Sequence, residues 1–182
     1  MNRLMLTMVL VAAPAYAAGK LTLESKDLKA NGTLPDKFVF NGMGCTGENL
    51  SPELSWKNAP EGTKSFALTV YDPDAPTGSG WWHWVVFNIP ADKSELPQGA
   101  GSGKAELPAG AAQGNTDFGQ AGYGGACPPP GDKPHHYIFT IHALKVDKLE
   151  LPATATAAYV GYNIHANELG SATLKATYAR KK

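Results

Sequence analysis

Residues 71–90 read YDPDAPTGSGWWHWVVFNIP. The second half, 82–89, is apolar at successive positions, which predicts a central strand buried on both faces. The run at 65–71 alternates between two kinds of side chain, as a strand with two different faces does. A Gly-rich turn joins the two runs, so we expect an antiparallel hairpin with Asp72 and His83 at the same end.

Asp72 opens an acidic loop that contains two prolines, Pro73 and Pro76. The prolines restrict the loop backbone and so reduce the entropy that would be lost on binding a ligand. The structural alternative for Asp72 is a turn-forming residue whose carboxylate caps its own loop. His83, taken alone, fits a histidine satisfied within the core.

A second polar segment, 123–137, reads YGGACPPPGDKPHHY. Glycines such as Gly125 let the backbone approach a ligand closely and present its N–H groups. His135 and Tyr137 share one face of the strand that begins there, whereas His136 should face away from the site. A neutral imidazole and a phenol can both donate hydrogen bonds to an anion.

Glycine and proline cluster between short apolar runs along the chain, which predicts a mainly β domain. Further strands are expected to begin at 21–23, 38–40 and 54–56, and another to span 137–144. Short helices are expected at 153–158 and at 163–169, the second continuing weakly towards Leu174. Residues 176–180 fit either a last strand or a helix end, and 96–120 a long excursion over the surface.

Residues 1–17 form a separate segment. Arg3 gives a positive start, an apolar run follows, and Ala15-Tyr16-Ala17 has the small-x-small pattern that signal peptidase cleaves. The apolar run is too short to cross a bilayer, which takes about 20 residues. We expect a cleaved secretory signal peptide at 1–17, a single domain at 18–182 and a periplasmic or secreted product; an uncleaved anchor is the alternative.

The composition argues against some classes of partner, and the two cysteines leave a choice between a disulfide and free thiols. No stretch is strongly basic, which argues against nucleic acid, and no segment after residue 17 has the length of a transmembrane span. In an oxidising compartment the two cysteines, Cys45 and Cys127, are expected to form a disulfide; two unpaired thiols are the alternative. Neither cysteine lies in a C-x-x-C motif, which argues against redox or zinc work.

The order of these motifs resembles the phosphatidylethanolamine-binding protein family, which includes the Raf kinase inhibitor-like proteins. The motifs are Asp-Pro-Asp-Ala-Pro from Asp72, Trp-x-His ending at His83, Pro-Pro-x-Gly from Pro128, and His-x-Tyr from His135. The stretch 41–56 is similar to the amino-terminal signature of the family, and Cys45 with the expected export suggests its bacterial periplasmic branch. The resemblance covers roughly residues 20–180 of this chain.

The resemblance implies an antiparallel β-sandwich with small peripheral helices and a cavity for phosphate, acetate or a phosphoethanolamine headgroup. Carried over by position, the cavity residues are Asp72, Pro76, Trp81, His83, Pro128, Pro129, His135 and Tyr137. Asp74, which would shape the loop, and Gly125 complete the predicted ligand-binding set. Three positions depart from the family pattern and bear on headgroup preference: His136 stands for the usual Arg, Trp82 for a second His of eukaryotic members, and Cys127 for a glycine.

The leading hypothesis is a non-enzymatic binding protein for a small anionic or phosphorylated ligand. The anion would lie over Gly-rich backbone with His83 and His135 donating, and Asp72 would orient the imidazole of His83. The alternative is an inhibitor of a kinase or protease that docks through the same pocket. The resemblance also makes a homodimer conceivable.

A hydrolase is less well supported, because no Gly-x-Ser-x-Gly motif places a nucleophile beside a base. The Gly-rich segment lacks the Gly-Lys-Ser/Thr ending of a nucleotide-binding P-loop. A metal site built from Asp72, Asp74, His83 and His135 is conceivable by ligand type, but the proline spacing fixes no familiar metal geometry. We therefore expect no metal and no cofactor.

Overall fold

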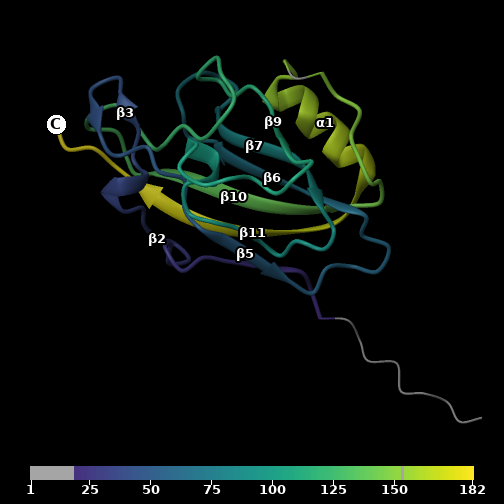
Figure 1. Cartoon of the computed structure of the whole chain (residues 1–182). Helices are drawn as coiled ribbons and strands as arrows, with labels where there is room; N and C mark the ends of the chain where they lie inside the picture. Colours follow the sequence, from purple (N-terminus) through teal and green to yellow (C-terminus); the bar gives the residue numbers. More distant parts are fainter. Residues whose placement is uncertain (1–18, 153) are drawn as a thin grey trace, which may run out of the picture.

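The computed structural model describes residues 19–152 and 154–182 (Figure 1). The expected signal peptide, 1–17, lies outside the described residues, and so does the expected domain boundary at residue 18. Within the described part the chain is mostly β-structure with a single α-helix, as the Gly- and Pro-punctuated sequence predicted.

Six strands form the larger of the two main sheets, in the order β2-β11-β10-β6-β7-β9. They span Gly32–Thr33 (β2), Ser65–Asp72 (β6), Trp81–Pro90 (β7), Ala112–Gln113 (β9), His135–Leu144 (β10) and Glu168–Tyr178 (β11). Every pairing in this sheet is antiparallel except the edge pairing of β11 with β2, which is parallel. The predicted antiparallel hairpin is β6–β7, and β10 flanks β6 on its other side.

A second, three-stranded sheet covers one face of the larger sheet and completes the expected sandwich (Figure 1). Its strands are β1 (Thr22–Glu24), β5 (Leu54–Lys57) and β8 (Glu95–Leu96), in the order β1-β5-β8. Side chains of both sheets share one buried cluster, in which Trp56 of β5 packs against Phe66 of β6 with ring centroids 5.4 Å apart. A small separate hairpin joins β3 (Asn41–Gly42) and β4 (Cys45–Thr46).

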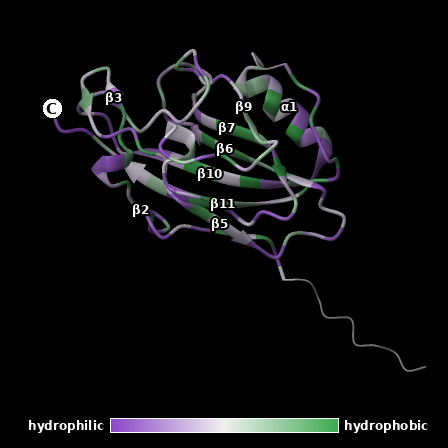
Figure 2. Cartoon of the chain, viewed as in Figure 1, coloured by the Kyte–Doolittle hydropathy of each residue, from purple (hydrophilic) through white to green (hydrophobic). Residues whose placement is uncertain are grey.

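Helix α1 (Ala157–Asn167) covers the other face of the larger sheet (Figure 1). Thr156 caps it, because its hydroxyl accepts a hydrogen bond from the N–H of Tyr159. Val160 and Ile164 of the helix pack into a second buried cluster with side chains of β6 and β7, so β7 is buried on both faces as expected. Figure 2 shows hydrophobic residues concentrated on β6, β7, β10 and one side of α1. In the described residues no helix combines the length and the apolar character that crossing a membrane requires.

The structure corrects three sequence-based assignments. Residues 36–38 form a 3-10 helix (η1, Asp36–Phe38) where a strand was expected from 38, and Val39 makes only an isolated bridge to Ala126. The expected helix at 163–169 begins earlier, at Ala157, and ends at Asn167. From Glu168 the chain continues as β11 and not as helix, because 168–178 pairs residue by residue with β10. The only local signal of this change was Gly170, which lies at a register shift of that pairing.

The excursion at 96–120 does run over the sandwich without forming a further domain. It contains a 3-10 helix (η2, Ala100–Ser102) and the short edge strand β9. A Cβ on Gly101 would lie 2.5 Å from the Trp84 ring, so the backbone of this segment packs directly on the core.

Candidate functional site

A pocket opens at the edge of the larger sheet, where β6 ends and where β7 and β10 begin. Its volume is about 150 Å³, which limits it to a small chemical group. Sites for drug-sized ligands begin at roughly 300 Å³. We call it the strand-end pocket; its walls are Met43, Asp72, Ala75, Pro76, Thr77, Trp81, His83, Phe118, Cys127, Pro128, Pro129, His135 and Tyr137.

The strand register explains why residues distant in sequence meet here. Asp72 is the last residue of β6 and lies opposite Trp81, the first residue of β7. Strand β10 runs antiparallel to β6 on its other side, so His135, its first residue, lies at the same edge. Thr77 tightens the turn between β6 and β7, because its hydroxyl donates to the carbonyl of Gly80.

Asp72 and His135 form a buried pair on the floor of the pocket. Oδ2 of Asp72 accepts a hydrogen bond from Nδ1 of His135 at 2.7 Å, and the other carboxylate oxygen accepts from the N–H of Asp74 at 2.8 Å. Nε2 of His135 lies 3.5 Å from a carboxylate oxygen of Asp132. Asp72 was expected to orient His83; it orients His135 instead, and it also caps its own loop as the structural alternative proposed.

His83 is oriented by the backbone of the Gly-rich segment. Its Nδ1 lies 2.7 Å from the carbonyl oxygen of Gly124. A carbonyl only accepts hydrogen bonds, so Nδ1 carries the proton. Burial lowers the pKa of His83 below its ordinary value of 6.5, although Gly124 and the charge of Asp72 oppose this. The imidazole is therefore neutral near pH 7, and Nε2 carries a free lone pair.

Tyr137 brings a phenol to the same pocket. Its ring packs edge-on against His83 with centroids 5.1 Å apart. Its hydroxyl is buried and forms no hydrogen bond of good geometry among the described residues, although the Cys127 backbone lies close to it. Burial and the nearby Asp72 charge raise the pKa of Tyr137 and outweigh the lowering effect of the Cys127 backbone, so the phenol keeps its proton and can donate it in a hydrogen bond.

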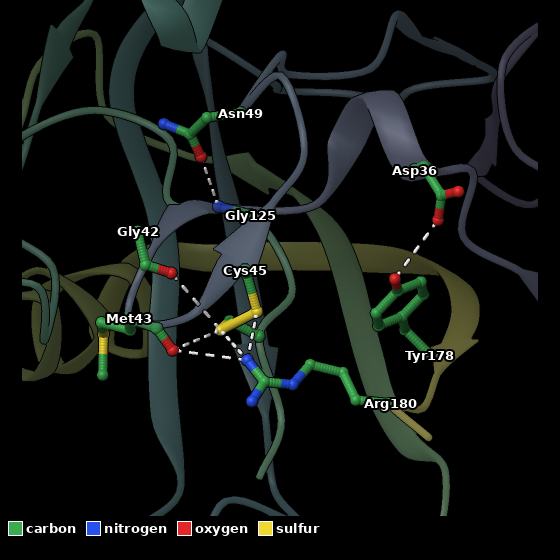
Figure 3. Close-up of a disulfide and its surroundings, with 9 residues drawn as sticks. Asp36, Gly42, Met43, Cys45, Asn49, Gly125, Tyr178 and Arg180 are labelled. Atoms are coloured by element: carbon green, nitrogen blue, oxygen red, sulfur yellow. Dashed lines mark hydrogen bonds between the residues drawn. A yellow bond between two sulfur atoms is a disulfide. The ribbon is translucent and has the colours of Figure 1, made fainter. Parts of the chain in front are cut away.

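The Gly-rich segment contributes its shape more than its N–H groups. The N–H of Gly124 donates to the carbonyl of His83, and the N–H of Gly125 donates to Oδ1 of Asn49 at 2.7 Å (Figure 3). Both donors are therefore already used within the protein. Gly125 lies outside the walls of the pocket, so the expectation that its N–H faces a ligand does not fit this structure.

Eight of the ten residues predicted to bind a ligand lie in the walls of the strand-end pocket; the exceptions are Gly125 and Asp74. The Asp74 carboxylate accepts hydrogen bonds from the backbone N–H and the Nδ1 of His136, both on the outside of the pocket. Burial would raise the pKa of Asp74, but these hydrogen bonds hold it below its ordinary value. Asp74 thus shapes the acidic loop, and His136 faces away from His135 as expected.

Five wall residues were not predicted: Met43, Ala75, Thr77, Phe118 and Cys127. Phe118 belongs to the Gly- and Ala-rich excursion, where no periodicity identified it, and its ring stacks on Phe40 at 4.5 Å. Its ring also meets the edges of Trp81 and His83. Ala75 and Thr77 could have been found from their position inside the acidic loop and turn.

Cys45 and Cys127 form the expected disulfide (Figure 3). The bond ties the β3–β4 hairpin, which carries Met43, to the segment that continues into Pro128 and Pro129. Met43 and Pro128 lie on the pocket wall beside Cys127, so the disulfide holds one side of the pocket together. Among the residues that the structure describes, no three His, Cys, Asp or Glu side chains gather as metal ligands would.

Residues 24–179 match the family model described as phosphatidylethanolamine-binding protein. The UPF0098 protein YbhB of Escherichia coli is 53% identical over 87% of this chain and 100% of its own length. The crystal structure of E. coli YbcL, described as a new member of the mammalian PEBP family, is 52% identical with a TM-score of 0.87, covering 90% of this chain and 100% of that one. A putative phosphatidylethanolamine-binding protein homologue, CT736 of Chlamydia trachomatis, is 30% identical with a TM-score of 0.75, covering 89% and 99%.

Proposed function

We propose that this chain, which belongs to the phosphatidylethanolamine-binding protein family, binds a small anionic or phosphorylated group in the strand-end pocket and performs no chemistry on it. The observation that carries the proposal is the hydroxyl of Tyr137. Leaving a buried hydroxyl without a partner costs free energy, about 1–3 kcal/mol, so a native structure that keeps one needs a reason. An oxygen of a bound anion supplies that partner.

The charges of the pocket determine which anions suit it. The walls contain one carboxylate, two imidazoles and one phenol, and no lysine or arginine. An anion here must therefore bring a proton of its own or meet a protonated histidine. A phosphate monoester fits the first requirement, because its second pKa is about 6 and a monoanion retains a P–O–H group. That group can donate to the free Nε2 of His83 while another oxygen accepts from Tyr137.

The proposal of binding without chemistry rests on the state of the possible nucleophiles. The Thr77 hydroxyl donates to the Gly80 carbonyl, and the sulfur of Cys127 is in the disulfide. Neither forms a hydrogen bond to His83 or His135 in the described structure, whereas nucleophilic catalysis needs a nucleophile within reach of a base.

We propose further that the protein works outside the cytoplasm, in the periplasm or as a secreted protein. The Cys45–Cys127 disulfide supports this location, because such bonds persist in oxidising compartments. The signal-peptide pattern at 1–17 supports it independently.

An NMR titration with phosphate, phosphoethanolamine and acetate tests the proposal. We expect saturable shifts at His83, His135 and Tyr137 and their loss in the His83→Ala variant, while Tyr159→Phe, an exposed tyrosine of α1, keeps them. Phosphate binding should weaken as the pH rises from about 6 to 8, because the phosphoryl proton is lost. Acetate is ionised throughout that range, so a parallel weakening of acetate binding would identify a titrating histidine instead. Millimolar ligands that produce no shifts would overturn the proposal.

One observation favours the second candidate, docking of a protein partner. Met43 is 69% exposed although it lies in the wall of the pocket, and methionine is over-used at surfaces that bind varied partners. Capture of a partner from exported proteins by the wild type but not by Met43→Ser, with phosphate titrations equal in the two, would support docking over small-ligand binding.

A further inference from the structure

The Cys45–Cys127 disulfide separates two hollows of the molecule. Cys127 is half-buried and lies in the wall of the strand-end pocket. Cys45 is buried and belongs to the lining of a second, polar hollow together with Tyr178 and Arg180. The two cysteines thus belong to the linings of different hollows.

Arg180 places its guanidinium directly against the disulfide. Its Nη1 lies 2.8 Å from Sγ of Cys45 and 3.2 Å from Sγ of Cys127. The same nitrogen lies 3.3 Å from the carbonyl oxygen of Met43. Within the described part of the chain Arg180 forms no ion pair with a carboxylate, so its charge is free to act on the sulfurs.

We propose that Cys45–Cys127 is a site of thiol–disulfide exchange with a dithiol oxidoreductase, and that its reduction loosens the strand-end pocket. Cys127 is the sulfur that is attacked, from the pocket side, and Cys45 is the leaving group. This chain lacks a C-x-x-C motif, so it is the substrate of the exchange and not its catalyst. The effect on the pocket, though not the exchange itself, rests on the proposed ligand-binding function.

The exchange proceeds in two steps. A thiolate of the oxidoreductase attacks Sγ of Cys127, a mixed disulfide forms, the Cys45–Cys127 bond breaks, and Cys45 leaves as a thiolate beside Arg180. The second cysteine of the oxidoreductase then attacks the sulfur of the first cysteine of the same oxidoreductase in the mixed disulfide, and Cys127 is released as a thiolate. Two electrons pass from the dithiol to this disulfide, and the two protons of the dithiol are taken up by the released cysteines. A guanidinium at 2.8 Å stabilises the leaving thiolate and so accelerates the first step.

The hairpin that carries Met43 depends on the disulfide for its position. Among the residues that the structure describes, strands β3 and β4 pair only with each other and belong to neither large sheet. The hairpin is held at its base by backbone hydrogen bonds, including those from Phe40 to Ala126 and from Gly47 to Phe40. Reduction removes the covalent tie and leaves the tip around Met43, which is part of the pocket wall, held by the base of the hairpin and the Arg180 contact; a less ordered wall binds its ligand more weakly.

Arg180→Gln and the neighbouring Lys181→Gln, which has the same change of charge, test the role of the guanidinium. The rate of reduction by dithiothreitol is followed by alkylating the free thiols at successive times and measuring the mass of the protein by mass spectrometry. We expect Arg180→Gln to be reduced about threefold more slowly than wild type, because a leaving thiol without the neighbouring cation leaves more slowly, and Lys181→Gln to match wild type. Equal rates for Arg180→Gln and wild type would overturn the assignment.

The direction of attack is tested with a thioredoxin-type protein whose second active-site cysteine is replaced by serine, which arrests the exchange at the mixed disulfide. Peptide mapping should place the link on Cys127; a link on Cys45 would contradict the proposed order. Phosphate titrations of the oxidised and reduced protein then test the pocket, and we expect affinity to fall severalfold on reduction. Equal affinities would refute that part, whereas an oxidised protein that binds no phosphate refutes the ligand proposal and leaves the exchange rates interpretable.

Discussion

The carboxylate of Asp72 and the imidazole of His135 are joined by a 2.7 Å hydrogen bond, and both side chains are almost completely buried. The two residues end and begin neighbouring strands, so their contact fixes the edge of the sheet at which the pocket forms. When one partner of a buried charged pair is removed, the other remains buried without a partner, and the folded protein is destabilised. The pair is therefore a structural element as well as the floor of the site.

Asp72→Ala should lower the free energy of unfolding by about 1–3 kcal/mol, because the buried Nδ1–H of His135 loses its acceptor. Asp72→Asn keeps an acceptor oxygen at the same place and should cost less. Urea denaturation of the two variants measures the difference. Asp92→Ala serves as control, since Asp92 is exposed and its ion pair within the described residues is with its neighbour Lys93. Equal midpoints for Asp72→Ala and Asp92→Ala would show that the buried pair does not stabilise the fold.

Tyr137→Phe should move stability and binding in opposite directions. The variant removes a buried hydroxyl that has no partner in the described structure, so the unliganded protein should be as stable as wild type or up to about 1 kcal/mol more stable. Phosphate affinity should fall roughly fivefold to tenfold, the equivalent of about one hydrogen bond. Urea denaturation and an NMR titration on the same samples give both values. A loss of stability without a loss of affinity would mean that the hydroxyl serves the fold and not a ligand.

The sequence predicted the strands that build the site better than the contacts within it. The buried runs that became β6, β7 and β10 have clear periodicity, and their antiparallel pairing places Asp72, His83 and His135 at one edge. Which imidazole Asp72 would hold could not be predicted, since both histidines lie within reach of the same strand end. The Gly124 carbonyl accepts a hydrogen bond from Nδ1–H of His83, so this nitrogen is not available to Asp72, and that contact spans 41 residues of sequence.

The parts that sequence reasoning missed are those fixed by tertiary contacts. Phe118 joins the pocket because its ring packs on Phe40, from a segment with no local pattern. Residues 168–174 look helical by composition, yet they form β11, because pairing with β10 outweighs weak helix propensity. The N–H of Gly125 looked available to a ligand, but it is used by Asn49, a residue 76 positions away.

The stability of the protein should decrease as the pH falls below about 6.5, because of His83. Burial holds the pKa of His83 below 6.5 in the native state, so the unfolded chain binds a proton in this range that the folded chain does not. The stabilisation is complete above pH 6.5 and is lost as the pH falls towards the native pKa. Urea denaturation of the wild type, measured at intervals of about half a pH unit between about pH 5 and pH 8, should show the free energy of unfolding rising with pH up to about 6.5.

His83→Gln should flatten that slope, since glutamine does not titrate, and His165→Gln, an exposed histidine of α1, should keep it. Glu168 makes a separate contribution to the pH dependence of stability, at lower pH. The hydrogen bond from His142 lowers the pKa of Glu168 below 4.5, so its contribution is present above pH 4.5 and lost below it. A slope between pH 5 and 6.5 that persists in His83→Gln would assign it to another group.

Gly125→Ala and Gly161→Ala should have opposite effects on stability. A Cβ on Gly125 would lie 2.3 Å from the carbonyl oxygen of Phe38 and 2.5 Å from the backbone nitrogen of Phe40, and backbone atoms cannot move aside as a side chain can. We expect a loss of about 3 kcal/mol or more. A Cβ on Gly161 of α1 would meet only the Trp82 ring at 3.9 Å, an ordinary contact. Alanine there should add about 0.5–1 kcal/mol, because it restricts the unfolded helix segment more than glycine does. Chemical denaturation measures both, and a Gly125→Ala protein as stable as wild type would mean that the Gly-rich segment is not held against η1 as the structure has it.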